Sequence, residues 1–237
     1  MNTFTFIKEH LAGPGRPRVL TTAMLRRLLD VAHGASARSS NAWRIKEMVG
    51  AGALGGVVKG VYLNLATTPP VEAAEALPFL RRGAVVSLHF VLGEFGVFNN
   101  HTDHITAILP VPRNSRGASF PRINTVQTGT GTFTFYGMAA EKLHAGDYED
   151  RLIPSRFYPC ATPERAFLDY LYLGANHRSS LTMPPLDSDI GDLDQTRIWR
   201  LAAAMGVEEI LDSWISKKAT YDEDEDVQNN MSLRLGF

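Results

Sequence analysis

Basic and amide side chains gather in one short segment near the N-terminus. The segment holds Arg38, Ser39, Ser40, Asn41, Arg44 and Lys46. An asparagine can bond adenine in two places and an arginine can do the same with guanine, whereas serine and lysine suit phosphate. Arg26, Arg27 and Lys59 would add contacts to the DNA backbone. These residue types predict an interface with double-stranded DNA; the alternative is a solvated helix face whose serines only cap the helix.

The charge of the chain is divided unevenly along its length. Residues 1–65 carry nine Lys/Arg and three Asp/Glu, a net charge of +6, whereas the remaining residues carry 15 basic and 22 acidic groups, a net charge of −7. A small basic segment joined to a larger acidic one indicates a polyanionic partner for the first segment only. The alternative is that so short a segment is basic by chance.

Two other clusters have residue types that bind metals. His101, Asp103 and His104 offer imidazole and carboxylate ligands, and the run Asp187–Asp194 is rich in acids. The histidine spacing matches no zinc signature, and the acidic run lacks the glutamate that closes a calcium loop. We therefore expect a solvated loop and a helix cap, and a metal-dependent hydrolase or nuclease is the alternative.

No catalytic constellation emerges elsewhere, and we expect neither enzymatic activity nor a cofactor. Arg165 and Asp169 are four residues apart and can pair across one turn of a helix. The segment Gly129-Thr130-Gly131 lacks the strand and helix that flank a nucleotide-binding loop, so it predicts a hairpin turn.

The elements that carry the basic residues follow from local signals. Thr21 or Thr22 can cap a helix to about Ala32, which leaves Arg26 and Arg27 off its apolar stripe. A second helix is expected from about Ser39 to Ala51, with an inward apolar stripe formed by Ala42, Ile45, Met48 and Val49. Trp43 of the same helix is expected to lie in the core. The glycine-punctuated stretch from Leu54 to Leu65 predicts a β-ribbon. Two helices followed by a ribbon predict a winged helix-turn-helix domain over residues 1–66.

Residues 71–237 predict a larger domain of mixed α/β structure, after a Pro-rich linker at Ala66–Pro70. The expected elements are a buried helix within Gly83–Gly96, strands at His104–Pro110, Arg122–Val126 and Thr132–Tyr136, a helix capped by Thr162, and helices at Leu193–Met205 and Val207–Lys217. The acidic run Tyr221–Asp226 is expected to be a mobile tail.

Composition narrows the class of protein. Hydrophobic residues make up 44% of the chain and charged residues 21%, as in globular domains with a buried core. No stretch has the roughly 18 uninterrupted apolar residues that a membrane helix needs, and charges interrupt the first ten residues where a signal peptide is apolar. Cys160 is the single cysteine, so no intramolecular disulfide can form. We expect a cytoplasmic protein without a membrane partner.

Four pieces of the sequence together resemble the AbiEi family of antitoxin-type transcriptional regulators. In chain order they are Gly52-Ala53-Leu54, Lys59-Gly60-Val61-Tyr62, Ser87-Leu88 and Thr162-Pro163-Glu164-Arg165-Ala166-Phe167-Leu168-Asp169. The resemblance covers about the first 175 residues, and its most specific piece is the last one. The chain departs from the pattern in the Gly/Pro-interrupted segment before Thr21 and in its acidic tail.

The resemblance implies a winged helix joined to an α/β antitoxin domain. Such a protein would bind inverted repeats in its own promoter, repress transcription, and counter a toxin of nucleotidyltransferase type without necessarily binding it. Carried over to this sequence, the DNA-binding role falls on Arg38 to Lys46 and on Lys59. The antitoxin role maps to no motif except the helix that contains Arg165, which could be purely structural.

Overall fold

The computed structural model describes residues 2–34, 38–100, 102–111, 124–177 and 179–235. The chain has a mixed α/β fold, and its contacts divide it into two compact units. The N-terminal unit comprises Met1–Ala84 together with Thr125–Phe133, and the C-terminal unit comprises Val85–Asn124 and Thr134–Phe237. None of the described helices combines the length and the apolar character needed to cross a membrane.

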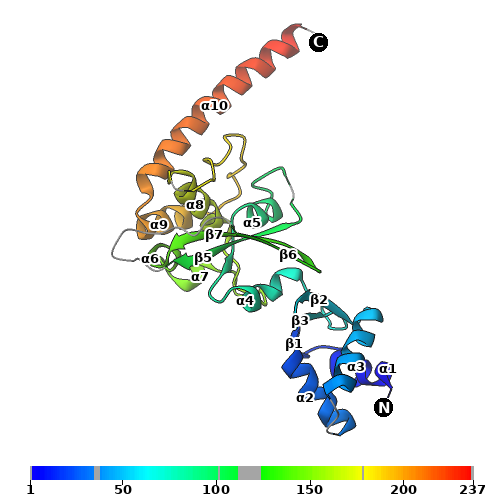
Figure 1. The fold of residues 1–237 in the computed structure, drawn as a ribbon. Coiled ribbons are helices and arrows are strands. Elements are labelled where there is room, and N and C mark those ends of the chain that lie inside the picture. The colour runs from blue at the N-terminus through cyan, green and yellow to red at the C-terminus, as the bar shows by residue number, and fades with distance from the viewer. Residues whose placement is uncertain (1, 35–37, 101, 112–123, 178, 236–237) are drawn as a thin grey trace. The chain divides into compact units, whose positions relative to one another are not determined.

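The N-terminal unit begins with α1 (Thr3–Phe6), a π-helical turn η1 (Ile7–Leu11) and the short strand β1 (Val19–Thr21). The two predicted helices follow as α2 (Thr22–His33) and α3 (Arg38–Gly50) (Figure 1). Of the two predicted caps, Thr21 is the one that caps α2, because its side chain accepts a hydrogen bond from Met24 N at 3.2 Å. The helices pack around one apolar cluster made by Phe6, Leu11, Leu20, Leu25, Leu29, Ile45, Met48 and Leu54.

The predicted ribbon is present as β2 (Leu54–Val58) and β3 (Val61–Asn64). β1 pairs antiparallel with β3, which gives a three-stranded sheet in the order β1-β3-β2. The turn between β2 and β3 contacts the start of α2, since Thr22 N donates to Gly60 O at 2.9 Å.

The Pro-rich segment at Ala66–Pro70 is tied to this unit. Arg18 donates through its guanidinium to Pro69 O and Pro70 O, each at 2.7 Å, and to both carboxylate oxygens of Glu75. Glu75 lies in the short helix η2 (Ala73–Ala76), which leads into α4 (Leu77–Leu80). These contacts explain why the unit extends past residue 66 to Ala84.

A hairpin turn at Gly129-Thr130 also belongs to the N-terminal unit. It joins β6 (Asn124–Thr128) to β7 (Gly131–Ala139), as the sequence predicts. Gly129 N donates to Val57 O at 3.2 Å. A Cβ atom at Gly129 would lie 2.3 Å from Gly56 O, so this close approach of two backbones requires glycine.

A second sheet has the order β4-β5-β7-β6, and β4, β5 and the part of β7 from Thr134 onward belong to the C-terminal unit. β5 (His104–Val111) and β7 match two predicted strands, whereas the third, Arg122–Val126, begins only at Asn124 within the described residues. The two-residue connection between β6 and β7 makes them an antiparallel pair. Short helices follow at α6 (Ala140–Leu143) and α7 (Tyr148–Arg151).

The prediction of one buried helix within Gly83–Gly96 is wrong. The segment forms strand β4 (Val85–Val86), a turn at Leu88 with φ +64°, and then helix α5 (His89–Glu94). The strand forms because Val85 and Val86 pair with Ile108 and Ala107 of β5. A short apolar run fits a buried strand as well as a buried helix, so its periodicity alone did not decide between them.

The C-terminal helices start where the sequence places them. Thr162 caps α8 (Pro163–Gly174), with its side chain accepting from Arg165 N, and Asp194 caps α9 (Gln195–Met205) in the same way from Arg197 N. α10 spans Glu208–Leu235 and continues well past the predicted end at Lys217. The acidic run Tyr221–Asp226 is thus helical rather than an irregular tail (Figure 1).

Candidate nucleic-acid interface

The orientation of α3 follows from three inward residues. Asn41, Ile45 and Met48 are buried, with exposed fractions of 2%, 5% and 0%. Because an α-helix turns by about 100° per residue, this row at i, i+4 and i+7 defines one side of the helix. The opposite side is centred near Trp43, which is 64% exposed, and includes the exposed Lys46.

This orientation contradicts two expectations about apolar residues of α3. Trp43 does not enter the core, and Ala42 and Val49 are exposed rather than part of the inward stripe. The inward position that the stripe missed is held by a polar residue, Asn41. A search for apolar periodicity passes over such a position, although the spacing from Asn41 to Ile45 and Met48 was readable in the sequence.

The side-chain amide of Asn41 is hydrogen-bonded within the protein. Its Nδ2 donates to Asp30 Oδ1 at 2.9 Å, and its Oδ1 accepts from Arg44 Nη1 at 3.4 Å. Both ends of the amide are therefore engaged, and the side chain links α2 to α3. In this structure Asn41 is a packing residue and not a surface group that could meet a base edge.

Arg44 lies on a flank of α3, about 160° around the helix from Lys46. It is half-buried, and its charge contributes to lowering the pKa of His33, after the larger effect of burial. His33 in turn stacks near Phe6, with ring centroids 6.2 Å apart. Arg44 thus faces the end of α2 and the N-terminal helices more than the outward side of α3.

The remaining predicted DNA contacts are basic or hydroxyl residues of the same unit. Arg27, Ser40, Lys46 and Lys59 are exposed, and Arg26 is half-buried with its Nε lacking a hydrogen-bond partner among the described residues. The backbone of Arg38 and Ser39 starts α3, but their side chains lie outside the described residues. Lys59 stands in the turn between β2 and β3.

The surface cations of this unit contrast with the ion pair between Arg18 and Glu75. Arg18 and Glu75 are joined at 2.5 Å with side-chain exposures of 13% and 2%. Within the described residues, no carboxylate lies within ion-pair distance of Arg27, Lys46 or Lys59. The whole unit carries eleven Lys/Arg and five Asp/Glu, a net charge of +6. The positive charge of Arg27, Lys46 and Lys59 is therefore available to an anionic partner.

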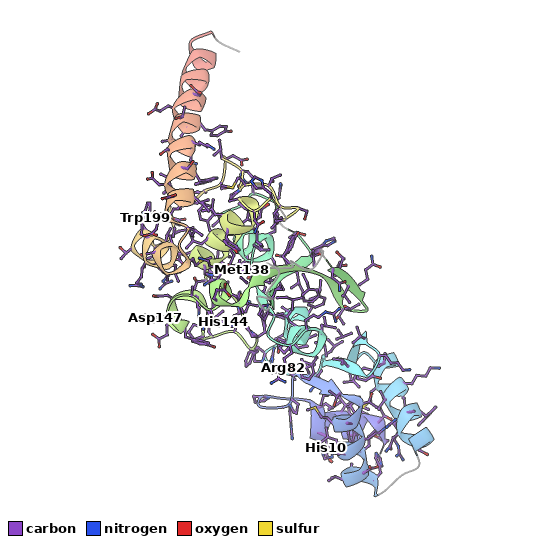
Figure 2. All side chains as sticks on the ribbon, turned by 60° about the vertical axis from the view of Figure 1, so that its left-hand side comes forward. His10, Arg82, Met138, His144, Asp147 and Trp199 are labelled. Atoms are coloured by element: carbon purple, nitrogen blue, oxygen red, sulfur yellow. The ribbon has the colours of Figure 1, made fainter. Side chains whose placement is uncertain are left out.

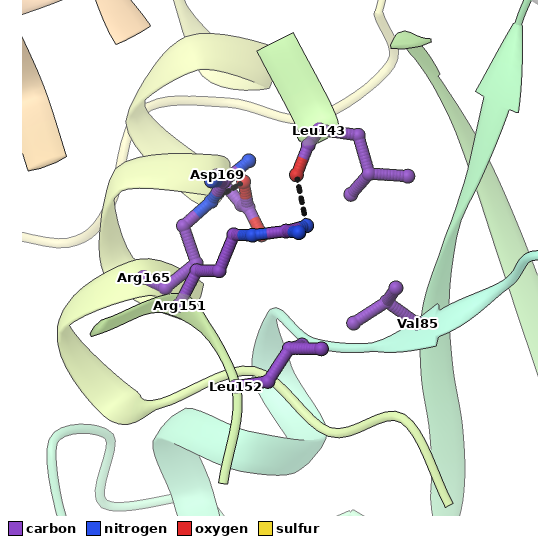
Figure 3. Close-up of a pocket in the computed structure, with 6 residues that line it drawn as sticks. All are labelled: Val85, Leu143, Arg151, Leu152, Arg165 and Asp169. Carbon is purple, nitrogen blue, oxygen red and sulfur yellow. Dashed lines mark hydrogen bonds and ion pairs between the residues drawn. The ribbon is translucent and has the colours of Figure 1, made fainter. Parts of the chain in front are cut away.

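The C-terminal unit has a second polar cluster, and this one is closed. Arg165 Nε and Asp169 Oδ1 form the predicted pair at 2.8 Å, and both side chains are buried (Figure 3). Ser87 Oγ donates to Asp169 Oδ2 at 2.8 Å. Arg165 also donates to Ala145 O at 2.9 Å and to Lys142 O at 2.7 Å. Two sequence pieces separated by 82 residues thus meet at one carboxylate.

The surroundings of this cluster leave no room for a ligand. Val85, Leu143 and Leu152 close around the pair, and Arg151 donates to Leu143 O at 3.5 Å (Figure 3). Burial raises the pKa of the Asp169 carboxyl, against the opposing charge and hydrogen bonds of Arg165 and the hydroxyl of Ser87. Met138 of β7 lies inside the same unit, whereas Asp147 lies at its surface (Figure 2). The cluster is a structural centre that joins the segment directly after β4 to α6 and α8.

The two candidate metal segments do not form a ligand set in the described part of the chain. No group of three or more His, Cys, Asp or Glu is placed there to hold a metal ion. Asp187 lines a hollow of about 190 Å³ together with His89, Phe98, Asn99 and Asn100, but Asp103 and His104 are not among the lining residues. His101 lies outside the described residues. Asp189 and Asp194 accept backbone hydrogen bonds instead, from Gly191 N and Arg197 N.

Comparison with known proteins adds no further constraint. No protein-family model matches the chain, and no curated protein sequence matches it.

Proposed function

We propose that this protein is a DNA-binding transcriptional repressor whose N-terminal unit is a winged helix. The single observation that carries the proposal is that Arg27, Lys46 and Lys59 are exposed without a carboxylate partner in the described part of the unit. Neutralisation of backbone phosphates by such side chains supplies much of the affinity of proteins for duplex DNA. In this proposal α3 enters the major groove, and the turn at Lys59 lies along the phosphates.

The order of elements supports the proposal. The unit runs α1, β1, α2, α3, β2, β3 with the sheet order β1-β3-β2. A helix pair followed by a two-stranded ribbon is an arrangement in which the second helix can read base edges. The net charge of +6 in this unit favours the same partner.

The antitoxin part of the proposal rests on the resemblance to the AbiEi family. Its supporting observation is that Ser87 and the Arg165–Asp169 helix, which carry the resemblance, form one hydrogen-bonded cluster. The protein would then bind inverted repeats in its own promoter and counter a nucleotidyltransferase-type toxin from the cytoplasm. The cluster is buried, so it would act by maintaining the C-terminal unit rather than by touching the toxin.

Titration of the full-length protein against labelled duplexes from its own upstream region tests the repressor proposal. At about 50 mM salt we expect a shift in fluorescence anisotropy that is stronger for this DNA than for a scrambled duplex of equal length. Affinity should then fall steeply with salt, as counterion release requires. Absence of binding at low salt would remove the proposal.

The antitoxin part needs a separate test. The gene next to this one would be expressed under an inducible promoter, with and without this protein. If it encodes a nucleotidyltransferase that arrests growth, co-expression should restore growth. Failure to restore growth, with repression of the promoter intact, would leave a repressor without an antitoxin role.

A further inference from the structure

The outward side of α3 is poor in the side chains that usually read bases. Asn41 is buried, and Arg44 lies on the flank toward α2. The outward side instead presents Trp43, 64% exposed, between Lys46 and Ser40. The small exposed residues Ala42 and Gly50 add little bulk to it.

An indole at the centre of this side has a restricted chemistry. It offers a large apolar surface and one N–H donor, and no acceptor. In the major groove, thymine is the base that displays an apolar group, its 5-methyl, and apolar side chains contact it there. Tryptophan is also enriched among the residues that dominate the energy of interfaces.

The acidic neighbour of Trp43 on this side does not prevent the approach of DNA. Glu47 Oε2 accepts from Thr3 Oγ1 at 2.6 Å, which holds the carboxylate toward α1. Lys46, on the other side of Trp43, has no carboxylate within ion-pair distance among the described residues. The charge beside the indole therefore favours an anionic partner, such as the phosphates of DNA, over a neutral or basic surface.

We propose that Trp43 is the specificity-determining residue of α3, and that it selects thymine in the major groove by apolar contact with the 5-methyl group. The proposal rests on the proposed DNA-binding function. It assigns selectivity to Trp43, whereas Lys46 contributes affinity without selectivity.

The test uses thymine and deoxyuridine, which differ only in that methyl group. A duplex is first selected from a random pool with the wild-type protein, and each thymine in it is then replaced singly by deoxyuridine. At the contacted position we expect wild-type affinity to fall about fourfold, since burying one methyl contributes about 0.8 kcal/mol and 1.4 kcal/mol is tenfold. Trp43→Ala should bind more weakly and show equal affinity for the two duplexes.

Two further variants serve as controls for Trp43→Ala. Lys46→Ala should weaken binding to both duplexes by the same factor and keep the fourfold ratio. Trp43→Phe should keep part of the ratio, because a ring still meets the methyl. A Trp43→Ala protein that retains the full fourfold ratio of affinities for the thymine and deoxyuridine duplexes would overturn the proposal. So would a Trp43→Ala protein that changes its oligomeric state but not this ratio.

Tryptophan fluorescence separates the Trp43 proposal from the proposed DNA-binding function. In a Trp199→Phe background the remaining tryptophans are Trp43 and the buried Trp214. Acrylamide should quench the exposed indole in the free protein, and selected DNA should protect it. If the wild type binds no DNA, both proposals fail. If it binds DNA but the indole stays fully quenchable, only the Trp43 proposal fails.

Discussion

The Arg165–Asp169 cluster of the C-terminal unit and the predicted DNA-contact lysines of the N-terminal unit differ in how their charges are satisfied. In the C-terminal unit Arg165 and Asp169 are buried and joined at 2.8 Å, and Ser87 holds the second carboxylate oxygen. On the surface of the N-terminal unit, Lys46 and Lys59 stand exposed without a carboxylate partner in the described residues. A charge that is satisfied internally serves the fold, whereas one left at the surface is free to meet a partner. The contrast directs the search for function to the N-terminal unit.

The largest expected effect is on the buried pair. Asp169→Leu should lower the free energy of unfolding of the C-terminal unit by about 3–5 kcal/mol, because it leaves the Arg165 guanidinium buried without its carboxylate. Urea denaturation of the full chain measures this through Trp214, which packs against Phe167 with ring centroids 4.9 Å apart; Trp43 and Trp199 are replaced by Phe in this background.

The double variant Arg165→Met/Asp169→Leu is the matched control. Replacing both partners removes the uncompensated charge, so much of the lost stability should return. A single variant as stable as the parent would show that the pair is not what joins the segment directly after β4 to α6 and α8, and the contrast between the units would lose its basis.

Removing Arg18 tests whether one N-terminal arginine behaves like the buried pair. Arg18→Met should destabilise the N-terminal unit by about 2 kcal/mol, because it leaves Glu75 buried without Arg18 as its partner. The effect should be smaller than that of breaking the Arg165–Asp169 pair, because the Arg18 side chain is 13% exposed. Hydrogen exchange should then increase in residues 69–80. Unchanged protection of that segment would mean that Arg18 does not tie it to the unit.

Substitution of the exposed cations should weaken DNA binding and leave the stability of the fold almost unchanged. Arg27→Ala, Lys46→Ala and Lys59→Ala should each change the free energy of unfolding by less than about 0.5 kcal/mol. Each should lower the slope of log affinity against log salt by about 1 if it contacts a phosphate. Thermal denaturation and anisotropy titrations at several salt concentrations measure the two effects. A variant that unfolds easily, or one with an unchanged slope, would place its residue outside the interface.

The smallest effect is a pH dependence of the C-terminal unit. Burial lowers the pKa of His89 and raises the pKa of its neighbour Tyr170 to about 12. The unfolded histidine, with a pKa near 6.5, takes up a proton more readily than the folded one, so stability should fall as the pH drops below about 6.5. His89→Asn should flatten this dependence in urea denaturations between about pH 5 and pH 8. A curve as steep as that of the wild type would assign the titration to another group.

Local signals in the sequence placed most elements correctly. Thr21, Thr162 and Asp194 identify helix starts because a capping side chain acts within three residues of itself. The segment at Val85 was misassigned because its pairing with β5 lies more than twenty residues away, which no local pattern reports. The segment at Ala66–Pro70 read as a linker for the same reason, since Arg18, which donates to Pro69 O and Pro70 O, lies 51 and 52 residues away in the sequence.

The sequence by itself determined the uneven charge, the order of helices and ribbon, and the four-residue spacing of Arg165 and Asp169, because composition and local periodicity are properties of the chain. Tertiary structure decided which side of α3 is exposed. Asn41 turned inward to meet Asp30, and Trp43 was thereby left outside. A polar residue can be buried when another element supplies its hydrogen-bond partner, and that partner exists only once α2 and α3 have packed together.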